Sequence, residues 1–190
     1  MNEIKHIDEL FKNLKSKNDS VRFNAFKELI AITDNKVSWI YDKWFILLDK
    51  ISSTNSYQRS IGLMLIANLC KSDLENRTGS IIDKYLDLFD DEKFITSRQA
   101  IQNVWKIALM NESNKRTIIN YLEKAYSENI HLSKHGNLIK QDIISSLFQI
   151  FLKQHDDNVM KTINEMIDSE IDDKFRKTLL KITTTTLHGQ

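Results

Sequence analysis

The sequence contains no proline and only four glycines in 190 residues. Average proline usage near 5% would supply roughly nine or ten in a chain of this length. Helix breakers and turn residues are therefore scarce, which excludes collagen-like, linker-rich and many all-β architectures. The apolar fraction of 41% is ordinary for a globular protein, and the chain is long enough to bury a sizeable core. We expect a single domain over residues 1–190.

Cysteine is almost absent too, since Cys70 is the only one and no disulfide can form within the chain. This favours a reducing compartment, and we expect a cytoplasmic location. The longest apolar run, Ile61 to Ala67, is far shorter than the roughly 18 residues that suggest a membrane span. The polar first ten residues lack a signal-peptide core, so we expect no contact with a membrane.

Neither sign of charge is in excess, because 27 Lys and Arg face 26 Asp and Glu, for a formal net charge of +1. Residues 1–95 hold 14 basic and 15 acidic side chains, and residues 96–190 hold 13 and 11. Neither half is therefore strongly basic, as a protein that grips nucleic acid through many phosphates would be.

Apolar residues recur every three or four positions along almost the whole chain, which is the spacing of one helix face. This periodicity predicts ten helices, at about residues 4–14, 20–33, 37–52, 57–71, 75–89, 94–110, 113–127, 137–153, 157–169 and 172–187. Short connections between them favour antiparallel pairs. We expect five helical hairpins, over residues 3–34, 37–72, 75–110, 113–153 and 156–187.

A repeat appears when the second helices of the five hairpins are aligned without gaps. One position is basic in every copy: Arg22, Arg59, Arg98, Lys140 and Arg176. Three positions later come Ala25, Gly62, Ile101, Ile143 and Leu179. Seven positions later come Leu29, Ile66, Trp105, Leu147 and Thr183. We expect these last two rows to face the core.

The segment Asn18 to Arg22, followed by Ala25 and Leu29, resembles the turn-Val-Arg-x-x-Ala signature of the HEAT/armadillo-like family of helical repeats. The other copies are looser, and Lys140 replaces the arginine in the fourth. The chain also resembles small bacterial HEAT-like proteins of unassigned function. This resemblance implies an all-α fold, a right-handed α-α superhelix of about five HEAT-like hairpins that stack to make a continuous core.

Residues that could carry chemistry have simpler explanations. His131 and His135 are four apart, but they lie in an expected loop without the glutamate of a zinc protease motif. The carboxylate clusters at 90–92, 156–157 and 172–173 each precede or open a helix, where negative charge is favoured. Cys70 is expected to be a buried, inert thiol, and no glycine-rich phosphate loop is present. We expect no catalytic residue, metal site or cofactor, and no enzyme activity.

The resemblance places the second helices on the concave side, so the residues one and five positions after the basic one should meet a ligand. In the resulting stripe, amides and hydroxyls predominate, and they suit the backbone of a peptide. The predicted partner-binding residues are Lys27, Ser60, Met64, Gln99, Asn103, Gln141, Ser145, Lys177 and Lys181. Trp39 and Tyr41 could be partly exposed anchors beside them. We expect a scaffold or adaptor that binds a protein or peptide.

A second hypothesis concerns the basic row Arg22, Arg59, Arg98, Lys140 and Arg176. These side chains could link neighbouring repeats, or they could contact phosphates. The resemblance admits the phosphate role, since some HEAT-like proteins are alkylpurine DNA glycosylases. The balanced charge makes nucleic acid the less favoured partner.

Overall fold

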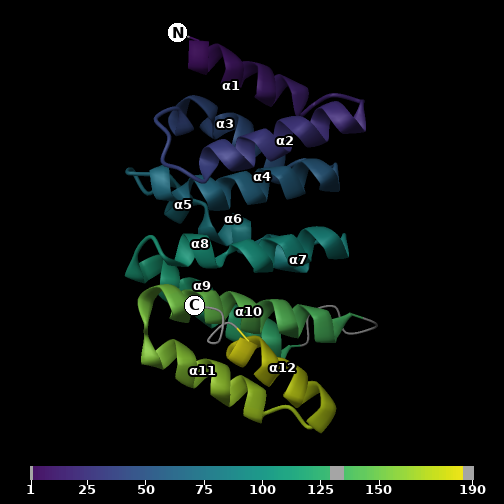
Figure 1. Ribbon diagram of the computed structural model, residues 1–190, viewed down its shortest axis with the longest axis vertical. Helices are drawn as coiled ribbons and strands as arrows, with labels where there is room; N and C mark the ends of the chain where they lie inside the picture. The colour runs from purple at the N-terminus through teal and green to yellow at the C-terminus, as the bar shows by residue number, and fades with distance from the viewer. Residues whose placement is uncertain (1, 129–134, 186–190) are drawn as a thin grey trace. The chain divides into compact units, whose positions relative to one another are not determined.

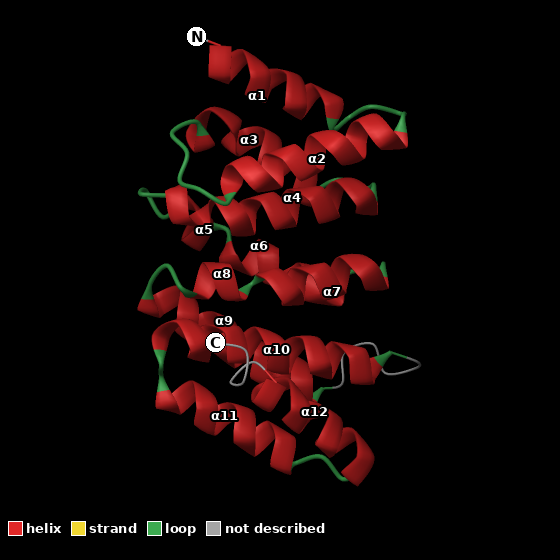
Figure 2. Cartoon of the chain, viewed as in Figure 1, coloured by secondary structure: helices red, strands yellow, loops and turns green. Residues whose placement is uncertain are grey.

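The computed structural model describes residues 2–128 and 135–185 (Figure 1). Regular secondary structure is helical throughout these ranges, and no strand occurs in them (Figure 2). The prediction of an all-α fold is confirmed. The chain divides into two compact units, residues 1–78 and residues 79–190. Because this boundary falls inside the repeat predicted at 75–110, the single domain over 1–190 stays a prediction.

The first unit consists of two helical hairpins. Its helices are α1 (Asn2–Asn13), α2 (Asp19–Thr33), α3 (Ile40–Ile51) and α4 (Ser56–Leu69), followed by the 3-10 turn η1 (Cys70–Ser72). Helix α1 packs on α2 and α3 packs on α4, and the second helices α2 and α4 also pack on each other. This is the pairing that the sequence repeat predicts for the first two hairpins.

The second helices of this unit begin with the same cap, repeated 37 residues apart. Asn18 Oδ1 accepts the backbone N–H groups of Ser20 and Val21 at 3.0 and 3.2 Å. Asn55 Oδ1 accepts those of Tyr57 and Gln58 at 2.9 and 3.3 Å. Such a cap satisfies donors that have no partner inside the helix and stabilises it by about 1 kcal/mol. Helices α2 and α4 therefore begin where the asparagines dictate.

The second unit is built around one long helix, α10 (Gly136–Gln154). The other helices are α5 (Arg77–Ser80, across the boundary), α6 (Ile82–Leu86), η2 (Asp87–Asp90), α7 (Phe94–Asn103), α8 (Trp105–Ala108), α9 (Glu112–Ser127), α11 (Asp157–Asp168) and α12 (Asp173–Thr185). Helix α10 packs on α7, α8 and α9, which precede it in the sequence, and on α11 and α12, which follow it. Its residues Ile143, Ile144 and Leu147 are fully buried.

Two predicted helices differ from the structure. The helix expected at 75–89 is wrong, because the segment forms the three short pieces α5, α6 and η2. Asn76 has a left-handed backbone (φ 53°) and Ile81 leaves the helical region (φ −115°, ψ 13°), so neither can sit inside a continuous helix. The helix expected at 94–110 is interrupted only at Val104, between α7 and α8.

The predicted core rows are buried with few exceptions. Every member of the row that begins with Ala25 is buried. In the row that begins with Leu29, Trp105 is only half-buried. Within the row that begins with Ala25, position 62 requires glycine because α3 approaches α4 closely there: a Cβ would lie 2.8 Å from Lys50 Cβ and 2.9 Å from Ile51 N.

Candidate functional site

In the first unit, the arginines of the basic row form contacts within the protein. Arg22 Nη1 donates to the Ser16 carbonyl oxygen at 2.7 Å, its other end pairs with Asp19, and its guanidinium stacks on the Tyr57 ring at 4.5 Å. Arg59 is buried and donates to the Ser53 carbonyl oxygen at 2.9 Å. Each arginine therefore fastens the turn that precedes its own helix, six residues back.

The same row joins neighbouring repeats in the second unit. Arg98 on α7 forms two hydrogen bonds with the Asp142 carboxylate on α10, of 2.6 and 2.9 Å, and these bonds raise the pKa of the arginine. Lys140 pairs with Glu170 in the turn before α12. Arg176 pairs with Asp173 three residues earlier and is the most exposed of the three.

The predicted partner-binding residues of the first unit have different environments. Lys27 is exposed and Met64 is half-buried. Ser60 is only 8% exposed, so the expectation that it faces a partner is wrong. Helix α4 packs on both α2 and α3, and its residues from Arg59 to Leu63 are all buried.

In the second unit, the predicted stripe is wholly or partly accessible. Lys177 and Lys181 on α12 are exposed, whereas Gln99, Asn103, Gln141 and Ser145 are half-buried. Helix α10 packs on both α7 and α12, so these three second helices are neighbours.

Two amide side chains of the stripe, Asn103 and Gln99, differ in their hydrogen bonds. Asn103 Nδ2 donates to the Gln99 carbonyl oxygen at 2.8 Å, and Asn103 Oδ1 accepts from Lys106 Nζ at 2.8 Å. The Gln99 Oε1 atom is buried and has no hydrogen-bond partner in the described structure. A buried acceptor left without a partner costs free energy, and a donor on a bound partner could satisfy it.

Of the two suggested aromatic anchors, Tyr41 is half-buried, as expected, whereas Trp39 is not exposed. Trp39 is buried at 3% exposed and meets the Phe11 ring edge-to-face at 5.9 Å, so it is a core residue. The Tyr41 hydroxyl contacts Asp73 and accepts the Glu75 N–H at 2.8 Å. Phe45, which follows the buried Trp44, is instead the exposed aromatic of α3, at 79%.

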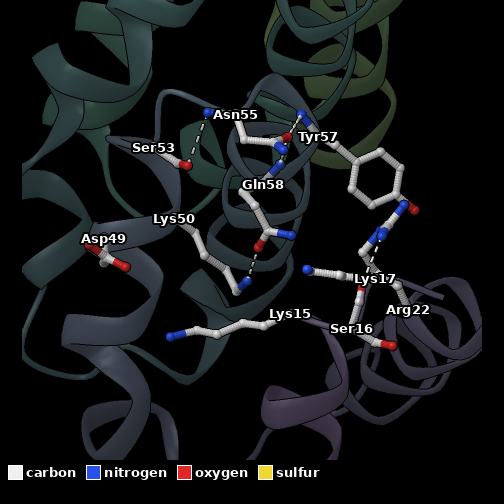
Figure 3. A pocket seen from close by; sticks show the side chains of 10 residues that line it. All are labelled: Lys15, Ser16, Lys17, Arg22, Asp49, Lys50, Ser53, Asn55, Tyr57 and Gln58. Atoms are coloured by element: carbon white, nitrogen blue, oxygen red, sulfur yellow. Dashed lines mark hydrogen bonds between the residues drawn. The ribbon is translucent and has the colours of Figure 1, made fainter. Parts of the chain in front are cut away.

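A cationic pocket of about 390 Å³ lies in the first unit, where the α1–α2 and α3–α4 turns meet (Figure 3). It is lined by Lys15, Ser16, Lys17, Arg22, Asp49, Lys50, Ser53, Asn55, Tyr57 and Gln58. Sequence reasoning missed this pocket. The available signal was Lys50, a charged residue at a core position of α3, three residues after the buried Leu47.

A second pocket, of about 410 Å³, lies in the second unit and has the opposite charge. Glu123, Glu165 and Glu170 line it together with Lys140. The Tyr126 hydroxyl donates to Glu170 at 2.7 Å, and burial raises the pKa of this tyrosine. Lys140 and Tyr126 bind Glu170, so the lysine and one of the three carboxylates of this pocket already have partners within the protein.

The remaining candidate groups have structural roles. Asp156 and Asp172 each accept a backbone N–H two residues later, at 3.1 and 2.8 Å, which confirms the capping interpretation for the clusters before α11 and α12. Asp91 accepts the Lys93 N–H at 2.8 Å, but the N-cap residue of α7 is Lys93, so the interpretation is not confirmed for the cluster at 90–92. Cys70 is buried, as expected.

His131 lies outside the described residues, and His135 is exposed and stacks on Phe94 at 4.4 Å. Within the described ranges, His, Cys, Asp and Glu side chains form no group of three or more that could hold a metal ion. A search of the same residues finds no helix with the length and apolar character needed to cross a membrane.

Comparisons with known proteins identify the fold. No family model matches the chain, and no curated protein matches it. Among solved structures, an engineered protein covers 94% of this chain and 77% of its own, with a TM-score of 0.59 and 14% identity. A designed armadillo repeat protein covers 96% and 82%, with a TM-score of 0.55 and 13% identity.

A second designed armadillo repeat protein, in complex with the peptide (KR)4, covers 94% of this chain and 99% of its own, with a TM-score of 0.51 and 13% identity. These similarities support the predicted HEAT/armadillo-like helical repeat fold, which is confirmed.

Proposed function

We propose that the protein is a non-enzymatic repeat scaffold that binds a protein or peptide along the second helices α7, α10 and α12. One observation carries this proposal: three neighbouring helices present accessible polar side chains at the same two positions. Amide and hydroxyl groups donate and accept hydrogen bonds, which suits the main chain of an extended segment. The lysines on α12 add positive charge at one end of this stripe.

The comparisons support a peptide-binding role in one respect. A designed armadillo repeat protein of similar fold is in complex with the peptide (KR)4, so a protein with this architecture can bind a peptide. The lone buried Cys70 fits a reducing compartment, and we place the proposed scaffold in the cytoplasm.

Binding to DNA, as in HEAT-like glycosylases, has less support. Phosphate contact needs cations that are free to reach a ligand, yet Arg98 and Lys140 are engaged by Asp142 and Glu170. Arg59 is buried against its own turn. The partners of these side chains favour the repeat-linking role.

The experiment is capture from an extract of the cells that make the protein, with matched variants. Asn103→Asp with Gln141→Glu adds two charges to the stripe. Asn120→Asp with Asn164→Asp adds the same charges to exposed positions of α9 and α11. We expect a protein that the wild type and the control retain and that the stripe variant loses. Equal capture by both variants, or no captured protein, would contradict the proposal.

A further inference from the structure

We propose that the cationic pocket of the first unit binds a phosphoryl group carried by a protein or peptide partner. The pocket is separate from the stripe on α7, α10 and α12. The identity of the partner as a protein rests on the proposed function, but the anion site itself does not.

The charges around the pocket are not compensated. Four cations line it, Lys15, Lys17, Arg22 and Lys50, against the single carboxylate of Asp49. Arg22 is paired with Asp19, but the ammonium groups of Lys15 and Lys17 form no hydrogen bond or ion pair with any described residue. In the view of Figure 3, the ammonium group of Lys50 lies between those of Lys15 and Lys17, and the charge of Lys15 acts on Lys50. An anion placed there would contact at least two positive groups at once.

Lys50 is the central residue of this arrangement. Its side chain is 98% buried, since only 2% of the residue is exposed, and its ammonium donates to Gln58 Oε1 but to no carboxylate of the described residues. Gln58 is held in place because its Nε2 donates to the Leu14 carbonyl oxygen at 2.9 Å. A buried cation normally forms an ion pair, whereas Lys50 is only influenced through space by Asp49 and forms no ion pair with a described residue. Burial, aided by the nearby charge of Lys15, lowers the pKa of Lys50 to about 8.

Two serine hydroxyls complete the lining in equivalent positions. Ser16 Oγ accepts the Asn18 N–H at 3.1 Å, and Ser53 Oγ accepts the Asn55 N–H at 3.1 Å. Neither hydroxyl hydrogen has an acceptor among the described residues, so both can donate to an anion. The helix N-termini themselves are already capped by Asn18 and Asn55, which leaves recognition to these side chains.

A phosphoryl group matches this site better than a carboxylate. The excess of cations over carboxylates calls for a ligand with more than one negative charge, and a phosphorylated side chain carries about −1.5 to −2 at neutral pH. A cavity of about 390 Å³ lies within the usual range for ligand sites of about 300–1,000 Å³. The lining lies at one pair of turns, whereas nucleic acid is bound by cations distributed along its backbone.

The test uses the full chain and two kinds of probe. Inorganic phosphate is titrated by NMR or calorimetry, followed by a glycine-serine heptapeptide with one central phosphoserine, its unphosphorylated form and a form with glutamate at that position. Two variants remove pocket charge: Lys15→Ser with Lys17→Ser, which changes exposed residues only, and Lys50→Met. Their controls are Lys5→Ser with Lys12→Ser on α1, and Lys43→Met, which changes another buried lysine of α3 outside the pocket.

We expect phosphate and phosphopeptide to bind the wild type, with an affinity that falls at least tenfold in both pocket variants and stays within twofold in both controls. The unphosphorylated and glutamate peptides should bind at least tenfold more weakly than the phosphopeptide. Equal losses in the control variants would mean that bulk charge alone attracts phosphate and would overturn the site. Binding of inorganic phosphate without the phosphopeptide would overturn the assignment to a protein-borne group.

Discussion

Arg98 and Asp142 are 44 residues apart in the sequence, yet they form two hydrogen bonds of 2.6 and 2.9 Å that join α7 to α10. Gln102 Nε2 donates to the same carboxylate at 2.8 Å, so Asp142 receives three bonds while it is nearly buried. A paired arrangement of this kind replaces the water that both charges lose on burial. In the second unit, Arg98 and Lys140 thus connect consecutive repeats through specific partners.

The first prediction concerns this pair. Arg98→Met should lower the free energy of unfolding by about 1–3 kcal/mol, because it leaves a buried carboxylate with only Gln102 as a partner. Adding Asp142→Leu should recover much of that loss, since no unpaired charge then remains. Urea unfolding of the wild type, both single variants and the double variant gives the coupling energy. An additive double variant would show that the pair is not coupled.

The second prediction tests the register of the core. Leu147 on α10 is fully buried, so Leu147→Ala should cost about 2–5 kcal/mol of stability through lost burial and the cavity it leaves. Leu138→Ala on the same helix is the control, because Leu138 is 36% exposed and its truncation should cost far less. Thermal or urea unfolding compares the two. Similar losses at both positions would place the wrong face of α10 in the core.

The sequence alone predicts the helical repeat because its evidence is local. Leu29, Ile66 and Leu147 occupy the same aligned position of three repeats and indicate a buried helix face. Asn18 indicates the start of a helix. Neither inference depends on residues elsewhere in the chain. The side chain that Arg98 would reach could not be predicted, since Asp142 belongs to another repeat. The alignment predicts that Ser60 is accessible, but Ser60 is buried in a helix that packs on both α2 and α3.

The cationic pocket could not be predicted from the sequence for the same reason. Lys15 and Lys17 belong to one turn and Lys50 to another helix, so only the packing of the two hairpins brings them together. The short pieces between Arg77 and Asp90 were missed for a different reason. The spacing of their apolar residues favours one helix, but Asn76 has a left-handed backbone, so a helix cannot continue through it.

The third prediction concerns the pH dependence of stability that Lys50 causes. The charged groups around it are Lys15 and Lys17 in the α1–α2 turn, Asp19 and Arg22 on α2, and Asp49 on α3. Its pKa falls from 10.5 in the unfolded chain to about 8 in the folded protein, so the unfolded state binds more protons between these values. Stability should therefore rise as the pH increases from about 8 to 10.5.

The size of this effect and its control follow from the same shift. A pKa lowered this far corresponds to roughly 3 kcal/mol, which is the destabilisation that the buried charge causes below about pH 8. Lys50→Met should raise the melting temperature at pH 7 and flatten the alkaline rise, whereas Lys43→Met should not flatten it. Chemical unfolding from pH 7 to 10.5 measures both. An unchanged alkaline slope in the Lys50 variant would disprove the assignment.

The last prediction is that the protein has little affinity for duplex DNA at physiological salt. A protein that makes about six to ten phosphate contacts loses roughly 10³–10⁵ in affinity between 50 and 200 mM salt. Here Arg98, Lys140 and Arg176 are paired with carboxylates, and Arg59 is buried. Titration of labelled duplexes, with and without an alkylated base, should give dissociation constants weaker than about 1 μM and a shallow salt slope.

Tight binding with a steep slope, abolished by Arg98→Ala with Lys140→Ala, would instead mean that these ion pairs open to receive phosphates. The same titration with Lys15→Ser and Lys17→Ser separates that outcome from binding at the cationic pocket, because only the latter depends on the exposed lysines of the α1–α2 turn.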